Sequence, residues 1–97
     1  MATYAITFRI ADEGDRDERY SSFLTYAESA NDTEVPWIET TSFLLIKSSL
    51  TARSLGELLA ESKVSKKLGD KFAVLGVNGE KPVHYGLEFP SIFSSYF

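Results

Sequence analysis

The chain contains no cysteine and only one histidine. The absence of cysteine excludes disulfide bonds, cysteine-ligated zinc and thiol catalysis, and it fits a cytoplasmic protein. The single histidine, His84, has no orienting motif near it in the sequence, and a general base needs a partner and a substrate within reach. We therefore expect His84 to have a structural role on an edge strand.

Long apolar runs and an excess of basic residues are also missing. No apolar run approaches the roughly 20 residues that span a bilayer, and residues 1–10 lack the charged start of a signal peptide. The net charge is −4 and the pI is about 4.9, whereas nucleic-acid binders are usually basic. We expect no membrane association, and a second protein as partner in preference to nucleic acid.

Ninety-seven residues suit one domain, and apolar periodicity predicts two helices in it. The first has an apolar stripe at i, i+3, i+4 and i+7, formed by Tyr20, Phe23, Leu24 and Ala27. The second spans Leu50–Ser62, with Thr51 as its N-cap. Leu50 and Leu55 occupy the positions of a hydrophobic staple around that cap.

Strands are predicted before, between and after these helices. Thr3–Ala11 alternates apolar and mild polar residues, as a strand with one apolar face does. Pro36–Ser49 is rich in β-formers and forms either a hairpin that bends near Thr41-Ser42 or one long bent strand. Phe72–Val77 is nearly all apolar, so we expect it to be buried on both faces.

The C-terminal part holds a turn signal and an aromatic tail. Asn78-Gly79 favours a two-residue hairpin turn, which would lead into an extra edge strand at Lys81–Tyr85. Residues 86–97 are too apolar for a solvated tail, because each large apolar side chain left in water forgoes about 2 kcal/mol. We expect this tail to pack on its own subunit or on a partner. The candidate residues for a dimer interface are Phe89, Phe93, Tyr96 and Phe97.

The order of these elements predicts an α+β fold. Strands interleaved with two helices favour a ferredoxin-like βαββαβ sandwich over residues 1–85, followed by the tail over residues 86–97. Both helices would lie on one face of an antiparallel sheet. The other face needs a cover, and pairing two sheets in a homodimer would supply it.

Three stretches of the sequence carry a family resemblance: TYAITFRI, ETTSFLLIKSSLTARSLGELL and DKFAVLGV. Over residues 3–85 the chain resembles the CRISPR-associated protein 2 family and its relatives, the VapD-type interferases and small SinR-like proteins. The resemblance implies a ferredoxin-like homodimer in which two sheets face each other. It also implies either metal-dependent nuclease activity or DNA binding without cleavage. In the nucleases, one Asp per subunit at the end of the first strand holds a divalent metal.

Arg9 stands where the family's metal-binding Asp would fall. An arginine cannot bind a cation but does bind anions such as phosphate. We therefore expect a non-catalytic dimeric binding module with no cofactor. The alternative is an endoribonuclease or endodeoxyribonuclease that uses Asp12, three residues further on, as its catalytic and Mg²⁺-binding residue at the dimer axis.

Other charged groups offer weaker candidates. Lys63, Lys66 and Lys67, with Lys71, form a basic cluster that would support nucleic-acid or anion binding together with Arg9, or else a solvated loop. The acidic residues of 12–18 suit helix capping better than a metal site, because they lack EF-hand spacing. Trp37 is expected in the core, with stacking on a base as the alternative.

Overall fold

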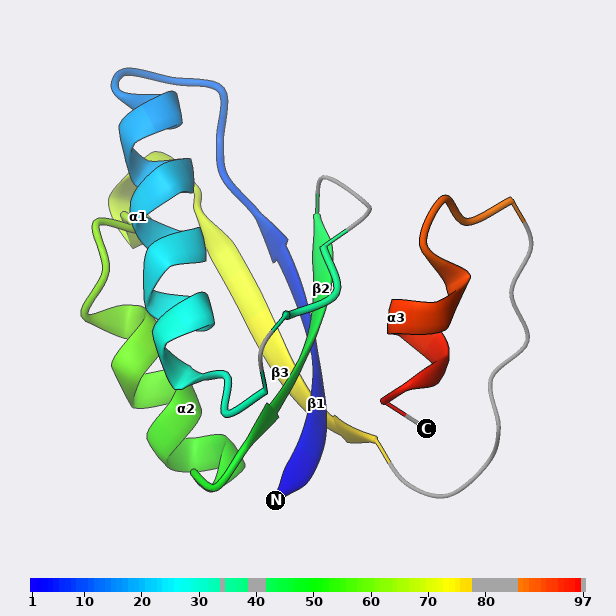
Figure 1. Cartoon of the computed structure of the whole chain (residues 1–97). Coiled ribbons are helices and arrows are strands. Elements are labelled where there is room, and N and C mark those ends of the chain that lie inside the picture. The colour runs from blue at the N-terminus through cyan, green and yellow to red at the C-terminus, as the bar shows by residue number, and fades with distance from the viewer. Residues whose placement is uncertain (34, 39–41, 78–85, 97) are drawn as a thin grey trace.

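The computed structural model describes residues 1–33, 35–38, 42–77 and 86–96, which form a three-stranded antiparallel sheet with helices on both of its faces (Figure 1). The elements in chain order are β1 (Ala2–Arg9), α1 (Arg16–Ala30), β2 (Phe43–Ser48), α2 (Ala52–Ala60), a 3-10 turn η1 (Lys66–Leu68), β3 (Lys71–Val77) and α3 (Pro90–Ser94). The strand order is β2-β1-β3, so the N-terminal strand is central.

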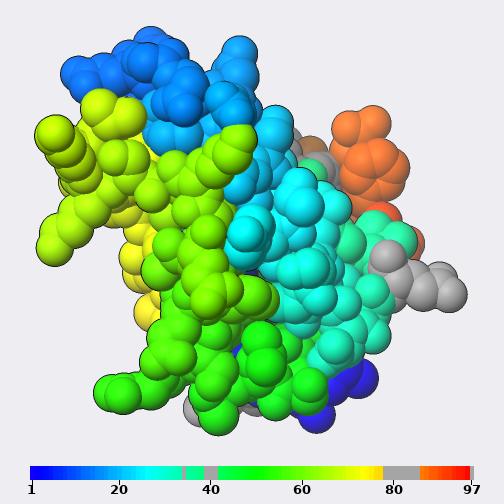
Figure 2. Space-filling model, turned by 90° about the vertical axis from the view of Figure 1, so that its left-hand side faces the viewer, coloured from blue at the N-terminus to red at the C-terminus, as the bar shows by residue number. Residues whose placement is uncertain are grey.

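The main core lies between the sheet and the pair α1 and α2. Alternate residues of β1 face these helices, as the predicted alternation requires. Phe23 of α1 joins the two layers, because its ring lies 4.8 Å from that of Phe8 and 5.5 Å from that of Phe72. Figure 2 shows α1 in cyan and α2 in green covering this side. The buried core residues are Tyr4, Ile6, Phe8, Ile10, Phe23, Ala27, Ala30, Leu44, Ile46, Leu55 and Leu59.

Local signals set the helix ends, and one of them works differently from expectation. The Thr51 hydroxyl accepts a hydrogen bond from the Ser54 backbone N–H, so the predicted N-cap of α2 is confirmed. Asp15 occupies the N-cap position of α1, but its carboxylate makes no capping bond and instead accepts from Arg19. Gly69 ends η1 with φ at 95°, a backbone conformation that favours glycine, and thereby turns the chain into β3.

The second face of the sheet is covered over β1 and β2 by the chain's own C-terminal segment. A small cluster of Ala5, Leu45, Trp37 and Tyr96 is buried there beneath α3. Trp37 is 4% exposed, which confirms its predicted core position. Among the described residues, this cover reaches β3 only at its last residue, Val77, which packs against the cluster. The prediction that Phe72–Val77 is buried on both faces is wrong, because Ala73 and Leu75 point to the open side of the sheet.

The predicted α+β class, with two helices on one face of an antiparallel sheet, is confirmed. Trp37 also forms an isolated antiparallel bridge with Leu45, on the outer side of β2. Residues 39–41 lie outside the described residues, so the choice between a hairpin and one bent strand at Pro36–Ser49 stays open. Residues 78–85 also lie outside them, and the extra strand predicted at Lys81–Tyr85 falls in this range. In the described ranges, no helix has the length and apolar character to cross a membrane.

Candidate functional site

An uncovered strip of side chains runs along β1 and β3 on the sheet face that α3 leaves open. We call it the open strip; it consists of Thr7, Arg9, Lys71, Ala73 and Leu75, all of them exposed. The strand pairing sets its composition, since Arg9 lies opposite Lys71 and Thr7 lies opposite Ala73. Leu75 is 54% exposed, which is high for a leucine in a strand. The strip is therefore apolar along β3 and cationic at one end.

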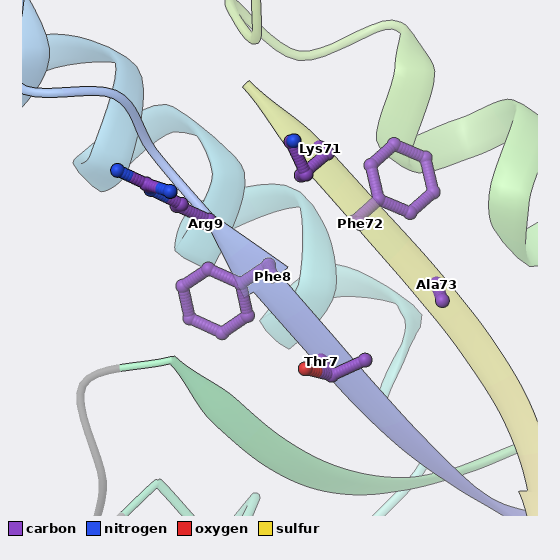
Figure 3. Close-up of a pocket in the computed structure, with 6 residues that line it drawn as sticks. All are labelled: Thr7, Phe8, Arg9, Lys71, Phe72 and Ala73. Carbon is purple, nitrogen blue, oxygen red and sulfur yellow. The ribbon is translucent and has the colours of Figure 1, made fainter. Parts of the chain in front are cut away.

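The cationic end of the strip lines a shallow hollow of about 280 Å³ (Figure 3). Thr7, Arg9, Lys71 and Ala73 line it, and Phe8 and Phe72, whose rings pack toward α1, complete its lining. Figure 3 shows Arg9 and Lys71 with their charged ends at the same end of the sheet. Like charges directly opposite each other on two strands are destabilising. This pair therefore costs stability unless an anion offsets it.

The acid nearest to this pair in sequence is directed away from it. Asp70 precedes Lys71, but its side chain is 1% exposed and lies on the helix side of the sheet. Its carboxylate accepts from Arg19 Nε at 2.9 Å, from the Ala11 backbone N–H at 2.8 Å and from the Ser65 backbone N–H at 2.8 Å. Asp70 is therefore fully engaged and does not compensate Lys71.

Arg19 is the most connected polar residue in this region, although it is 1% exposed. Besides Asp70, its guanidinium donates to the Asp15 carboxylate, to the Glu13 carbonyl at 2.8 Å and to the Ala11 carbonyl at 2.8 Å. These bonds join the loop after β1, the first turns of α1 and the start of β3. The Arg19–Asp70 ion pair, which we call the Arg19–Asp70 lock, therefore holds in place the two strand ends that carry Arg9 and Lys71.

The charges of this lock shift the titration of its members. Burial raises the pKa of Asp70, but the hydrogen bonds from Arg19, Ser65 and Ala11 outweigh burial and hold that pKa below its usual value. The hydrogen bond from Arg19 likewise lowers the pKa of Asp15. The bonds to Asp70 and then Asp15 raise the pKa of Arg19, which stays charged.

We expect acid to weaken the fold through these two carboxylates. Their pKa values are lowered on folding, so their stabilisation is complete above the unfolded pKa of about 3.9 and is lost as the pH falls through the folded pKa. The free energy of unfolding, measured by urea denaturation, should therefore fall steadily below about pH 4. In Asp15→Asn the fall should be shallower. An unfolding free energy that stays constant from pH 5 to pH 3 would contradict this assignment.

The lysines of the predicted basic cluster lie at different places in the structure. Lys63 forms an exposed ion pair with Glu18, which raises the pKa of Lys63, so it does not join the open strip. Lys66 and Lys67 lie in η1 and are exposed. Lys66 and Lys71 line a second hollow, of about 380 Å³. Of the predicted anion-binding residues, only Arg9 lies on the open strip, where its neighbour is Lys71.

The predicted metal ligand Asp12 lies in the exposed loop between β1 and α1. Among the residues that the structure describes, no group of three or more histidine, aspartate or glutamate side chains is placed to hold a metal ion. The acidic residues near Asp12 have other roles, since Asp15 pairs with Arg19, Glu18 with Lys63 and Asp17 with Arg16. His84 lies outside the described residues.

The aromatic tail packs on its own chain. Tyr96 is 5% exposed, and its hydroxyl contacts the Val35 carbonyl at 2.6 Å and the Thr33 hydroxyl at 3.0 Å. The ring of Phe93 lies 5.1 Å from that of Trp37. Phe89 is 51% exposed. Of the predicted interface residues, Phe93 and Tyr96 thus cover the sheet, Phe89 faces solvent, and Phe97 lies outside the described residues.

Sequence reasoning missed the Arg19–Asp70 lock, although the sequence contains a signal for it. The buried residues of α1 are Arg19, Phe23, Ala27 and Ala30, so an arginine occupies the buried helix face at i−4 from Phe23. Such an arginine needs an acid that is also buried. The sequence does not say which of the fourteen acids supplies it.

Comparisons with protein-family models, curated proteins and solved structures found no match to this chain. Its function is therefore argued from the open strip and from the elements around it.

Proposed function

We propose that this chain is a non-catalytic, homodimeric binding module related to the CRISPR-associated protein 2 family, and that the open strip is its interaction surface. The observation that carries the proposal is the exposure of Leu75 and Ala73 on the part of the sheet face that α3 and Trp37 do not cover. Burial of such an exposed side chain in an interface stabilises the complex by about 25 cal/mol per Å² of apolar surface removed from water. A second copy of the chain offers the same strip.

The strand order supports a ferredoxin-like βαββαβ topology. The Trp37–Leu45 bridge lies where the second strand of that topology would pair with the third. On this assignment β2 is the third strand and β3 is the fourth, and the order from one edge is fourth, first, third, second. All the described pairings are antiparallel, as the assignment requires.

The end of β1 supports binding without catalysis. Arg9 is its last residue, and Lys71 lies opposite. Two cations at this point repel Mg²⁺, which prefers carboxylate oxygens. A nuclease dependent on Asp12 would have to bring that carboxylate from the loop to the axis against this repulsion. The position of the charges therefore favours a module that has lost metal chemistry.

The position of α3 restricts how two sheets can meet. α3 and Trp37 already cover β1 and β2, so a second copy can reach only the β1–β3 side unless the tail moves. The interface would then centre on Leu75 and Ala73. The exposed Phe89 lies away from this strip, beside Val35 and Pro36 in a hollow of about 250 Å³.

We expect light scattering to give a mass near twice 10.8 kDa for the wild-type protein. Leu75→Glu should weaken dimerisation at least about tenfold, because it places a charge in the apolar part of the interface. The matched control is Val35→Glu, since Val35 is 51% exposed on a different surface. Both substitutions are at exposed sites, so each should change stability by less than about 0.5 kcal/mol.

A wild-type protein that stays monomeric at high concentration would refute the homodimer. A dimer that resists Leu75→Glu would move the interface away from the open strip. In that case Phe89→Glu tests whether the exposed Phe89 of the tail makes the contact instead, and it leaves the buried Tyr96 in place.

A further inference from the structure

We propose that Arg9, Lys71 and Thr7 form a binding site for the phosphate group of a small phosphomonoester or of free inorganic phosphate. The site is the cationic end of the open strip, and it belongs to each single chain. It therefore requires neither a second copy nor a metal.

The first step of the argument is the uncompensated charge. Arg9 and Lys71 are direct cross-strand neighbours, and the Cβ atoms of such neighbours are about 4.5–5.5 Å apart. Within the described ranges neither has an ion pair, whereas Arg16 and Lys63 have one each and Arg19 has two. An arrangement that places two cations together and turns the adjacent Asp70 away suits an external anion.

The second step concerns the side chains that line the hollow. A guanidinium offers a planar fork of donors that fits phosphate oxygens, and an ammonium adds a compact positive charge. Thr7 is two residues before Arg9 on the same face of β1, about 6.6 Å away, and its hydroxyl adds a further donor. A phosphomonoester carries about −1.5 to −2 charge at pH 7, which matches two cations.

The third step is the size and surroundings of the hollow. Its volume of about 280 Å³ exceeds what one phosphate needs and leaves space beside Ala73 for a small organic group. Beyond Arg9 and Lys71 the open strip continues along β3 with Ala73 and Leu75, so the strip itself offers no continuous positive track for a long polyanion. The surroundings therefore favour a single phosphate group over an extended nucleic-acid backbone.

The test is an NMR titration of ¹⁵N-labelled full-length protein at pH 7.5 and constant ionic strength. The probes are inorganic phosphate and phenyl phosphate, with sodium chloride as the reference. We expect chemical-shift changes that saturate with phosphate concentration and that are largest at the backbone amides of Thr7, Arg9, Lys71 and Ala73. Arg9→Gln and Lys71→Gln should each raise the dissociation constant about tenfold, the loss expected for one charge-assisted contact.

The control variant is Arg53→Gln, because Arg53 is an exposed cation on α2, on the opposite side of the sheet. It should bind phosphate as the wild type does. Phenyl phosphate binding several-fold more tightly than inorganic phosphate would identify an ester as the ligand, and equal affinity would identify free phosphate. The proposal would be overturned by chemical-shift changes that do not saturate, that sodium chloride also produces, or that persist in Arg9→Gln.

Light scattering in the same buffers keeps this inference separate from dimerisation. A monomer with saturable phosphate shifts retains the site and rejects the homodimer. A dimer without such shifts retains the homodimer and rejects the site.

Discussion

Replacing Arg19 by methionine is expected to lower the folding equilibrium constant by about two to three orders of magnitude. The guanidinium is buried and donates to two carboxylates and to two backbone carbonyls. Methionine has a similar length but no donors, so it would leave the buried Asp70 carboxylate without its counter-charge. Urea denaturation at pH 7 measures the loss. Two to three orders of magnitude correspond to about 3–4 kcal/mol, which is a large part of the free energy of unfolding of about 5–15 kcal/mol that a native protein of this size has.

Arg16→Met is the matched control, because Arg16 begins the same helix but is only partly buried and pairs with the exposed Asp17. It should change the free energy of unfolding by less than about 0.5 kcal/mol. The double variant Arg19→Met with Asp70→Asn removes both charges and should recover part of the loss, as coupled partners do. An Arg19→Met protein as stable as the Arg16→Met protein would contradict the lock.

Replacing Tyr96 by alanine is expected to cost about 3 kcal/mol, the lower end of the range for a buried aromatic residue. The ring is buried in the cluster beneath α3, and the hydroxyl donates to the Val35 carbonyl and lies 3.0 Å from the Thr33 hydroxyl. Its loss should release α3 from the sheet and open Trp37 to water. The single tryptophan makes this measurable, because its fluorescence emission should move to longer wavelength in the folded variant.

Tyr96→Phe separates the two contributions, since it keeps the ring and removes the hydroxyl. It should cost about 1 kcal/mol for the lost hydrogen bond to the Val35 carbonyl. Ser94→Ala is the control in the same segment, because Ser94 is exposed on α3 and its replacement should leave the tryptophan emission unchanged. Unchanged emission in Tyr96→Ala would mean that α3 is not the cover of this face.

Periodicity was enough to predict most of the fold. The alternation in β1 and the i, i+3, i+4 stripe of α1 depend on residues close together in sequence, and the structure follows both. Thr51 also acts locally, since its partner Ser54 is three residues away. Arg9 was singled out because the resemblance drew attention to it, and the structure places it on the open strip.

The errors arise where a residue depends on a distant part of the chain. Every position in Phe72–Val77 is apolar or small, but the described cover that would bury its second face reaches only Val77 at the end of the strand. That cover is set by Tyr96 and Trp37, which no local pattern links to β3. The role of Lys71 as the neighbour of Arg9 follows from strand register, and register depends on pairing rather than on either strand alone.

The Arg19–Asp70 lock has an evolutionary consequence. The two residues are 51 positions apart, and the loss of either leaves a buried charge without its partner. A lineage that exchanged them for apolar residues would pass through a much less stable protein, unless both changes arose together. Positions 19 and 70 are therefore expected to be inherited as one unit, while the exposed strip beside them remains free to diverge toward new ligands.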